Sequence, residues 1–185
     1  MRYIFVDLGA FDGDTIDYFL HKAEGLPAKA SRFRIYAFEP NPKFFVRLSE
    51  LMDSTPQIKQ ISNQAAWIED CEMEFAVDQA ESPMGSTLMP GKREMWSKSA
   101  KQKVQAFNFP EWLEQFVDDY VIVKCDIEGA EFVIFDKMLK DGTLNLMDEL
   151  WCEFHPNKVR EYTTTHKNEL MADIRAAGVN LKEWH

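Results

Sequence analysis

Residues 3–15 read YIFVDLGAFDGDT, and this stretch decides the fold. The run from Tyr3 to Asp7 has the composition of a buried strand, and from Thr15 onward apolar side chains recur at helical spacing. Between these segments, Gly9 and Gly13 let the backbone turn tightly and approach a ligand, while the helix start offers unpaired N–H groups. The stretch therefore predicts a strand, a ligand-binding turn and a helix.

The same alternation of strand and helix continues along the chain. A second strand at residues 33–38 leads into Asn41 and Pro42, a good helix cap followed by a good first helical residue. Further strands are predicted over residues 58–66, 73–77, 120–125, 150–154 and 179–184. Further helices are predicted over residues 111–116, from about 130 to Gly142, and over 168–177. This order predicts an α/β fold with a Rossmann-like, doubly wound and mostly parallel sheet.

Between residues 78 and 103 the apolar periodicity disappears. Such a long irregular segment in a compact domain is usually functional or disordered, and we predict a mobile lid. Several basic residues lie close together in this segment. They indicate either a solvated loop or a rim that attracts an anionic acceptor. These residues are Lys92, Arg93, Lys98, Lys101 and Lys103.

Size and charge limit the function classes. A chain of 185 residues, 45% hydrophobic, is long enough for one core and predicts a single domain over residues 1–185. The formal net charge of −10 repels phosphate backbones, so we expect no nucleic-acid partner. Three widely spaced cysteines indicate free thiols, and no leader or membrane span is apparent, which predicts a cytoplasmic protein.

The turn after the first strand is acidic. Its glycines are spaced G-x-x-x-G rather than G-x-G-x-x-G, and Asp7, Asp12 and Asp14 surround it, so a pyrophosphate would be repelled. These acids suit a cationic ligand without phosphate, such as S-adenosylmethionine, which carries an ammonium and a sulfonium. A structural turn with solvated aspartates is the alternative.

An acid also stands at the end of the second predicted strand. Glu39 is placed where dinucleotide enzymes hold the two ribose hydroxyls of a nucleoside. The alternative is an exposed loop acid, but the acidic turn upstream favours a nucleoside site.

Two later strand ends carry further polar groups. Asp126 and Glu128 follow the strand at 120–125, and Glu153 and His155 follow the strand at 150–154. Because ligands bind at the carboxyl edge of an open α/β sheet, we expect all four to converge there as catalytic candidates. The alternatives are helix capping by Glu128 or Glu131, and a structural role for the histidine.

Five segments taken together resemble the FkbM family of methyltransferases. They are VDLGAFDGDT, FEPNP, GSTL, VKCDIEGAEF and CEFHP, which occur in the family's order and approximate spacing between Val6 and Pro156. The resemblance implies transfer of a methyl group from S-adenosylmethionine to a hydroxyl of a sugar, glycan or related small molecule.

The resemblance also implies roles for particular residues. Asp7, Gly9 and Gly13 would line the methionine part of the cofactor, Glu39 would hold the ribose, and Asp126 and Glu128 would face the reacting centre. Ser86 and Thr87 would lie close to the cofactor or the acceptor. The full set expected to bind the cofactor is Asp7, Gly9, Ala10, Phe11, Asp12, Gly13, Thr15, Glu39, Pro40, Asn41, Ala66 and Asp126.

Methyl transfer needs alignment and a base, because the sulfonium already activates the methyl group. We expect Asp126 or His155 to take the hydroxyl proton, with Glu128 and Glu153 positioning the acceptor. The same four side chains could hold Mg²⁺ or Mn²⁺, but their spacing fits no specific metal signature, so the sequence predicts no metal site.

The chain departs from the pattern of this fold class at its C-terminal end. It stops after the sixth main strand, so either the sheet lacks the antiparallel seventh strand or the given sequence is a shortened one. We expect no added domain for acceptor recognition, which leaves this task to the lid, the last helix or a partner subunit. Exposed aromatic residues near Trp96 and Trp184 would be contacts in a possible homodimer.

Two other functions compete with a methyltransferase. An NAD-dependent oxidoreductase would share the strand, the turn, the helix and the ribose-binding acid. It would also carry a G-x-G-x-x-G turn, which this chain lacks. A non-catalytic nucleoside-binding partner subunit would keep the fold without the chemistry. Intact acids at four strand ends favour the enzyme.

Overall fold

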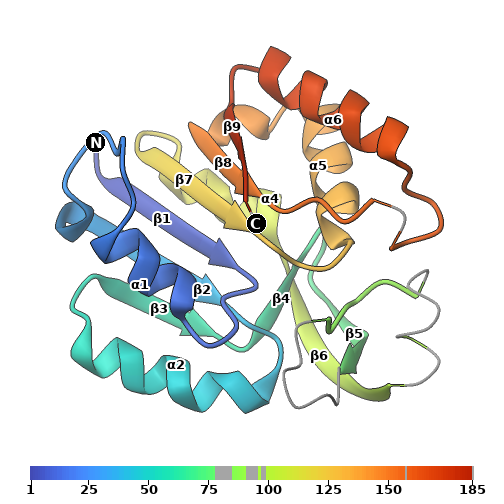
Figure 1. Cartoon of the computed structure of the whole chain (residues 1–185), viewed down its shortest axis with the longest axis horizontal. Coiled ribbons are helices and arrows are strands. Elements are labelled where there is room, and N and C mark those ends of the chain that lie inside the picture. The colour runs from blue at the N-terminus through green and yellow to red at the C-terminus, as the bar shows by residue number, and fades with distance from the viewer. Residues whose placement is uncertain (78–84, 91–95, 97–98, 157, 185) are drawn as a thin grey trace.

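A six-stranded parallel sheet forms the centre of the computed structural model, which describes residues 1–77, 85–90, 96, 99–156 and 158–184. The strand order is β3-β2-β1-β7-β8-β9 (Figure 1). The strands are β1 (Tyr3–Leu8), β2 (Phe33–Phe38), β3 (Ile58–Ser62), β7 (Tyr120–Cys125), β8 (Glu149–Cys152) and β9 (Asn180–Glu183). All five neighbouring pairs run parallel, which confirms the predicted Rossmann-like α/β fold.

Helices cover both faces of this sheet because successive side chains of a strand point to opposite faces. On one face Phe5 packs with Ile16 and Phe19 of α1 (Asp14–His21) and with Leu48 of α2 (Pro42–Ser54). On the other face, Ile4 and its same-side neighbours pack against three helices. These are α4 (Phe109–Leu113), α5 (Ala130–Asp141) and α6 (Thr164–Ala176). In the described part of the chain, short 3-10 turns lie at Ala30–Arg32, Glu114–Phe116 and Leu144–Leu146.

The helix ends follow the predicted capping chemistry. The Asn41 side chain accepts a hydrogen bond from the backbone N–H of Lys43 at 3.1 Å, which starts α2. Gly142, at φ 72°, ends α5. Helix α6 begins four residues before the predicted residue 168 because Thr163 caps it through the N–H of His166.

The predicted third strand at residues 58–66 is wrong as one element. The chain bends at Asn63, whose side-chain amide donates to the carbonyl of Glu39 at 2.8 Å. Strand β3 stays in the main sheet, whereas β4 (Gln64–Trp67) leaves it for a second sheet. A bend of one residue left no gap in the apolar pattern, so the sequence did not indicate it.

The second sheet has three strands in the order β4-β6-β5, and it contains a strand that the sequence analysis missed. Strand β6 (Ala100–Asn108) lies partly where a loop to residue 103 was predicted, and it pairs antiparallel with β5 (Cys71–Val77). Alternation of the apolar Val104 and Ala106 with the polar Lys103 and Gln105 was the available signal. Residues 78–84, 91–95 and 97–98 of the predicted lid lie outside the described residues.

The last described strand, β9, pairs parallel with β8. The three cysteines are free thiols. Within the described part of the chain, no helix has the length and apolar character to cross a membrane.

Gly9 is where the first turn meets the main sheet, and the contact leaves no room for a side chain. A Cβ there would lie 2.0 Å from the carbonyl oxygen of Asp126, and φ is +76°. Gly25 has a similar φ of +70°, but a Cβ added there would have nothing within 4 Å, so Gly25 is a matched control.

We expect Gly25→Ala to lower the free energy of unfolding by about 1 kcal/mol, the cost of a left-handed backbone. Gly9→Ala should cost about 1–3 kcal/mol more, because the added methyl group must displace backbone. Urea unfolding of both variants measures the difference. Equal losses would contradict the close approach.

Candidate active site

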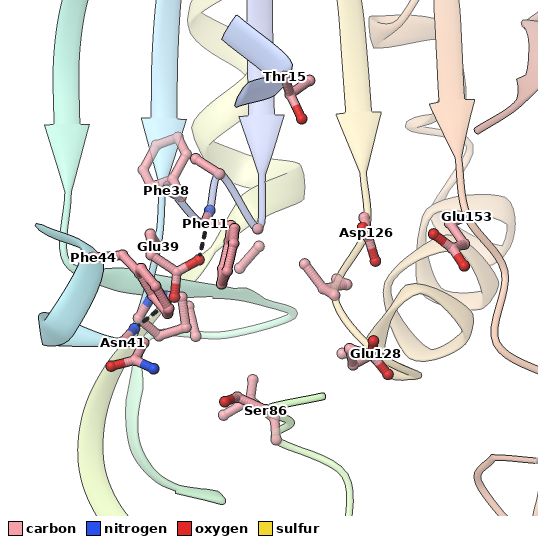
Figure 2. A pocket seen from close by; sticks show the side chains of 18 of the residues that line it. Phe11, Thr15, Phe38, Glu39, Asn41, Phe44, Ser86, Asp126, Glu128 and Glu153 are labelled. Atoms are coloured by element: carbon pink, nitrogen blue, oxygen red, sulfur yellow. Dashed lines mark hydrogen bonds between the residues drawn. The ribbon is translucent and has the colours of Figure 1, made fainter. Parts of the chain in front are cut away.

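A cavity of about 700 Å³ opens at the carboxyl ends of the main strands. Its walls come from the turns after β1, β2, β7 and β8 and from the second sheet. In Figure 2, Glu39 and its aromatic neighbours lie on one side of the cavity, and Asp126, Glu128 and Glu153 lie on the other. The cavity therefore has a Glu39 end and an acid end.

At the Glu39 end a buried carboxylate is held between two backbone donors. Glu39 Oε1 accepts from the N–H of Asn41 at 2.7 Å, and Oε2 accepts from the N–H of Phe11 at 2.9 Å (Figure 2). Burial raises the pKa of Glu39 to about 7, against the effect of these two hydrogen bonds. The rings of Phe11 and Phe44 pack beside it with centroids 4.1 Å apart.

The turn after β1 is fixed by its backbone. The N–H groups of Gly9 and Ala10 both donate to the carbonyl of Phe38, at 3.0 and 3.1 Å. Phe11 has a φ of 49°, which is rare for a side chain of its size. The backbone N–H of Phe11 donates to Glu39, so a hydrogen bond within the cavity wall holds this strained residue in place.

The remaining acids of this turn face solvent and a cation. Asp12 and Asp14 line the cavity, and Arg47 of α2 pairs with them at 2.7 and 3.5 Å. These pairs are exposed, so they contribute little stability, but they occupy the guanidinium.

Behind the turn lies a buried ion pair. The ammonium of Lys124 lies 3.2 Å from Oδ1 of Asp7 and donates to the carbonyl of Gly9 at 2.9 Å. Burial raises the pKa of Asp7. Burial alone would lower the pKa of Lys124, but the charge of Asp7 raises it, and the pKa of Lys124 is raised overall. The pair thus ties β1 and β7 together beneath the cavity.

The acid end is built around a buried histidine. His155 Nε2 lies 3.7 Å from Asp126, 3.6 Å from Glu128 and 3.6 Å from Glu153. Its Nδ1 lies 3.1 Å from the carboxylate of Glu131, which also accepts from the backbone N–H of His155 at 2.8 Å. The sequence analysis treated Glu131 only as an alternative helix cap.

Protonation at the acid end is shifted by burial and by charge. Burial raises the pKa of Asp126, although Lys124 and His155 oppose the shift. Burial alone would lower the pKa of His155. The hydrogen bond and the charge of Glu131 raise this pKa by more, so the pKa of His155 is raised overall. Asp126 is therefore a carboxylate whose affinity for a proton exceeds that of an exposed aspartate.

The structure brings most of the predicted residues to one cavity. Those that line it are Gly9, Ala10, Phe11, Asp12, Thr15, Glu39, Pro40, Asn41, Ala66, Asp126, Glu128 and Glu153. Asp7, Gly13 and His155 do not line it: Asp7 lies behind the turn, Gly13 precedes α1 against Leu51, and His155 lies beneath the acids.

Ser86 and Thr87 of the segment GSTL lie in different environments. Ser86 lines the cavity, whereas Thr87 is fully buried. Its hydroxyl donates to the carbonyl of Glu128 at 2.9 Å and accepts from the N–H of Met89. Thr87 also pairs with Ala76 of β5 through two backbone hydrogen bonds, so it connects this segment both to β5 and to the loop after β7.

Other lining residues escaped the sequence analysis. They come chiefly from α2, the second sheet and the C-terminal segments: Phe44, Gln64, Ala65, Phe75, Leu88, Lys158 and Trp184. Apolar periodicity marked several of them only as core. Trp184, which the sequence analysis named as a contact in a possible homodimer, is half-buried and stacks on Trp151 with ring centroids 6.0 Å apart.

The sequence profile of the methyltransferase FkbM domain matches residues 7–178. The chain belongs to the FkbM methyltransferase family. No curated protein matches this FkbM-family chain. A solved structure, methyltransferase FkbM from Methylobacillus flagellatus KT, matches it with a TM-score of 0.54 and 14% sequence identity. The match covers 96% of this chain and 39% of the other, so the chain spans about two fifths of that protein, and the likeness concerns the fold.

The buried pair beneath the cavity gives a test by unfolding. Lys124→Met should lower the free energy of unfolding by about 3–5 kcal/mol, because it leaves the Asp7 carboxylate buried beside no cation. The double variant Asp7→Asn with Lys124→Met should recover most of that loss. Urea unfolding measures each free energy, and a double variant no more stable than Lys124→Met would argue against the pairing.

Proposed function

We propose that this FkbM-family chain is an S-adenosylmethionine-dependent O-methyltransferase whose acceptor is a hydroxyl of a sugar, glycan or related small molecule. The observation that carries the proposal is one cavity with the buried Glu39 carboxylate at one end and three carboxylates at the other.

The Glu39 end fits a nucleoside. A carboxylate has about four lone-pair sites, and the backbone donors of Phe11 and Asn41 use two, so Glu39 can still accept both ribose hydroxyls. Phe11, Phe44 and Leu88 supply apolar surface for a base, and a volume of about 700 Å³ is within the usual range of cofactor sites.

The turn after β1 suits a ligand without phosphates. Asp12 and Asp14 would repel a pyrophosphate, and Arg47 already pairs with both. This charge pattern supports S-adenosylmethionine over NAD. Gly9, Ala10 and Thr15 would contact its amino-acid part.

The acid end suits the removal of a proton from a hydroxyl. S-adenosylmethionine, when bound, supplies an electrophilic methyl group that leaves its sulfur as the acceptor oxygen bonds to it. Asp126 accepts the hydroxyl proton, since it lines the cavity and burial raises its pKa. Glu128 and Glu153 accept hydrogen bonds from neighbouring hydroxyls, and the His155 ring lies beneath these acids, 3.7 Å from Asp126.

The charge of the acid end supports the proposed acceptor class. Carboxylates accept hydrogen bonds and repel anions, which favours a neutral polyol. Lys101 and Lys103 of the basic stretch pair with Glu74 and Glu72 at 3.8 and 2.5 Å, so these two lysines do not draw an anionic acceptor to the cavity.

Titration with S-adenosylhomocysteine tests the cofactor. We expect micromolar binding by the wild-type protein and a loss of at least about tenfold in Glu39→Gln, which cannot accept two hydroxyls as an anion does. Affinity in the wild type should fall as the pH drops from 8 to 6, because Glu39, with a pKa of about 7, becomes protonated. The change is bounded by about tenfold per pH unit.

The control variant is Glu24→Gln, an exposed acid outside the cavity, which should keep both the affinity and its pH dependence. Glu39→Gln should show a flat profile over the same range. Absence of binding by the wild type, or stronger binding of NAD, would refute the proposed cofactor.

Turnover tests the base. Asp126→Asn should lower the rate of S-adenosylhomocysteine formation with a panel of sugar acceptors by about 10²–10⁴-fold, the usual contribution of a general base. Affinity for S-adenosylhomocysteine should change little. Asp173→Asn, on the exposed side of α6, should leave both quantities unchanged. Wild-type turnover in Asp126→Asn would remove Asp126 from the mechanism.

A further inference from the structure

One ring nitrogen of a buried histidine points into a group of acids without making a hydrogen bond to them. His155 is 3% exposed, and its Nδ1 is held by Glu131 at 3.1 Å. Its Nε2 has carboxylate oxygens at 3.6, 3.6 and 3.7 Å, all beyond hydrogen-bonding distance. Among the described residues, Nε2 has no closer polar partner. These oxygens belong to Glu128, Glu153 and Asp126.

The spacing of these atoms fits one cation between them. Ligand atoms at about 2.0–2.3 Å from a common ion lie roughly 3–4.5 Å from one another. Single ligand atoms of Asp126, Glu128 and His155 all lie within 4.8 Å of each other. The cluster would therefore need to contract by only a fraction of an ångström to coordinate an ion.

The orientation of the histidine has the arrangement seen around bound metals. Metal-ligating histidines usually donate their other ring N–H to a carboxylate, which fixes the ring and raises its basicity. Here Glu131 is the carboxylate that accepts from Nδ1 of His155. Its own position is fixed because it also accepts from the backbone N–H groups of Gly129 and His155, at 2.7 and 2.8 Å. A fully buried glutamate is thus used to orient one imidazole.

The acid end also gathers several carboxylates around one imidazole. Four carboxylates surround the imidazole, and Lys158 pairs with one of them, Glu128, at 3.3 Å. Lys124 is 4.0 Å from Asp126 but closer to Asp7, at 3.2 Å.

We propose that Asp126, Glu128 and His155 bind one divalent cation that accepts both nitrogen and oxygen ligands, such as Mn²⁺, with Glu153 as a further ligand. The donor set of one imidazole and two or three carboxylates suits Mn²⁺ better than Mg²⁺, which prefers oxygen alone. The sequence spacing indicated no such site, because its ligands come from two separate strand ends.

The position of the cation gives it a task in the reaction. Asp126, Glu128 and Glu153 line the cavity, as Figure 2 shows, so the open coordination positions face the space where an acceptor would lie. A cation there would hold an acceptor hydroxyl and polarise its O–H bond. This task rests on the proposed function, whereas cation binding itself does not.

Binding of Mn²⁺ is measured on protein first treated with a chelator, in the absence of methyl donor and acceptor. Loss of the electron paramagnetic resonance signal of free Mn²⁺ gives the number of bound ions and their affinity. We expect one ion per chain. Asp126→Asn and His155→Gln should each weaken binding by at least about tenfold, and Glu131→Gln by about 10–100-fold, as for other residues that orient a metal ligand.

Two controls keep the result specific. Asp173→Asn removes an exposed acid far along α6 and should bind Mn²⁺ as the wild type does. Circular dichroism confirms that each variant is folded, and Glu128→Gln replaces any variant that is not.

The outcomes separate this site from the proposed cofactor. No saturable binding up to about 1 mM Mn²⁺, the weak end of protein sites for divalent cations, would overturn the proposal. So would equal affinity in the wild type and Asp126→Asn. Glu39→Gln should keep Mn²⁺ while losing S-adenosylhomocysteine. Mn²⁺ binding without any S-adenosylhomocysteine binding would leave the metal site standing and refute the cofactor.

Discussion

The contact between the turns that follow β1 and β7 is the constraint on which the rest of the cavity depends. The buried ammonium of Lys124, on β7, faces Asp7 and donates to the carbonyl of Gly9. Gly9 in turn lies so close to the carbonyl of Asp126 that only a glycine fits. The two motif-bearing turns are therefore fixed relative to each other, and with them the distance between the Glu39 end and the acid end.

Two buried glutamates organise the two ends in the same way. Glu39 accepts from the backbone of the first turn and of the segment before α2, and Glu131 accepts from the backbone before α5 and after β8. Each carboxylate thus joins two loops that are distant in sequence. Glu39 keeps lone pairs directed at the cavity, whereas Glu131 acts through His155. Buried carboxylates are costly unless they are hydrogen-bonded, which makes each of them a strong determinant of local geometry.

The second sheet gives the cavity its remaining wall. Strand β4 leaves the main sheet at Asn63, and the amide of Asn63 binds the carbonyl of Glu39, so the departure of the chain is tied to the residue that defines one end of the site. Thr87 links β5 to the carbonyl of Glu128 at the other end. Glu128 and Phe11 are the non-glycine residues with positive φ in the described chain, and both lie on the cavity. Backbone strain concentrated in this way is typical of functional sites.

The sequence by itself determined the parallel sheet, the helix caps and the strand ends that carry acids, because these features depend on periodicity and on residues close together in the chain. It placed Glu39, Asp126, Glu128 and Glu153 at one edge, since the carboxyl ends of parallel strands share that edge. Only the tertiary structure decided that Asp7 pairs with Lys124 behind the turn, that His155 lies beneath the acids, and that β4, β5 and β6 form a separate wall. These features depend on contacts between residues tens of positions apart, whose distances and directions no local pattern specifies.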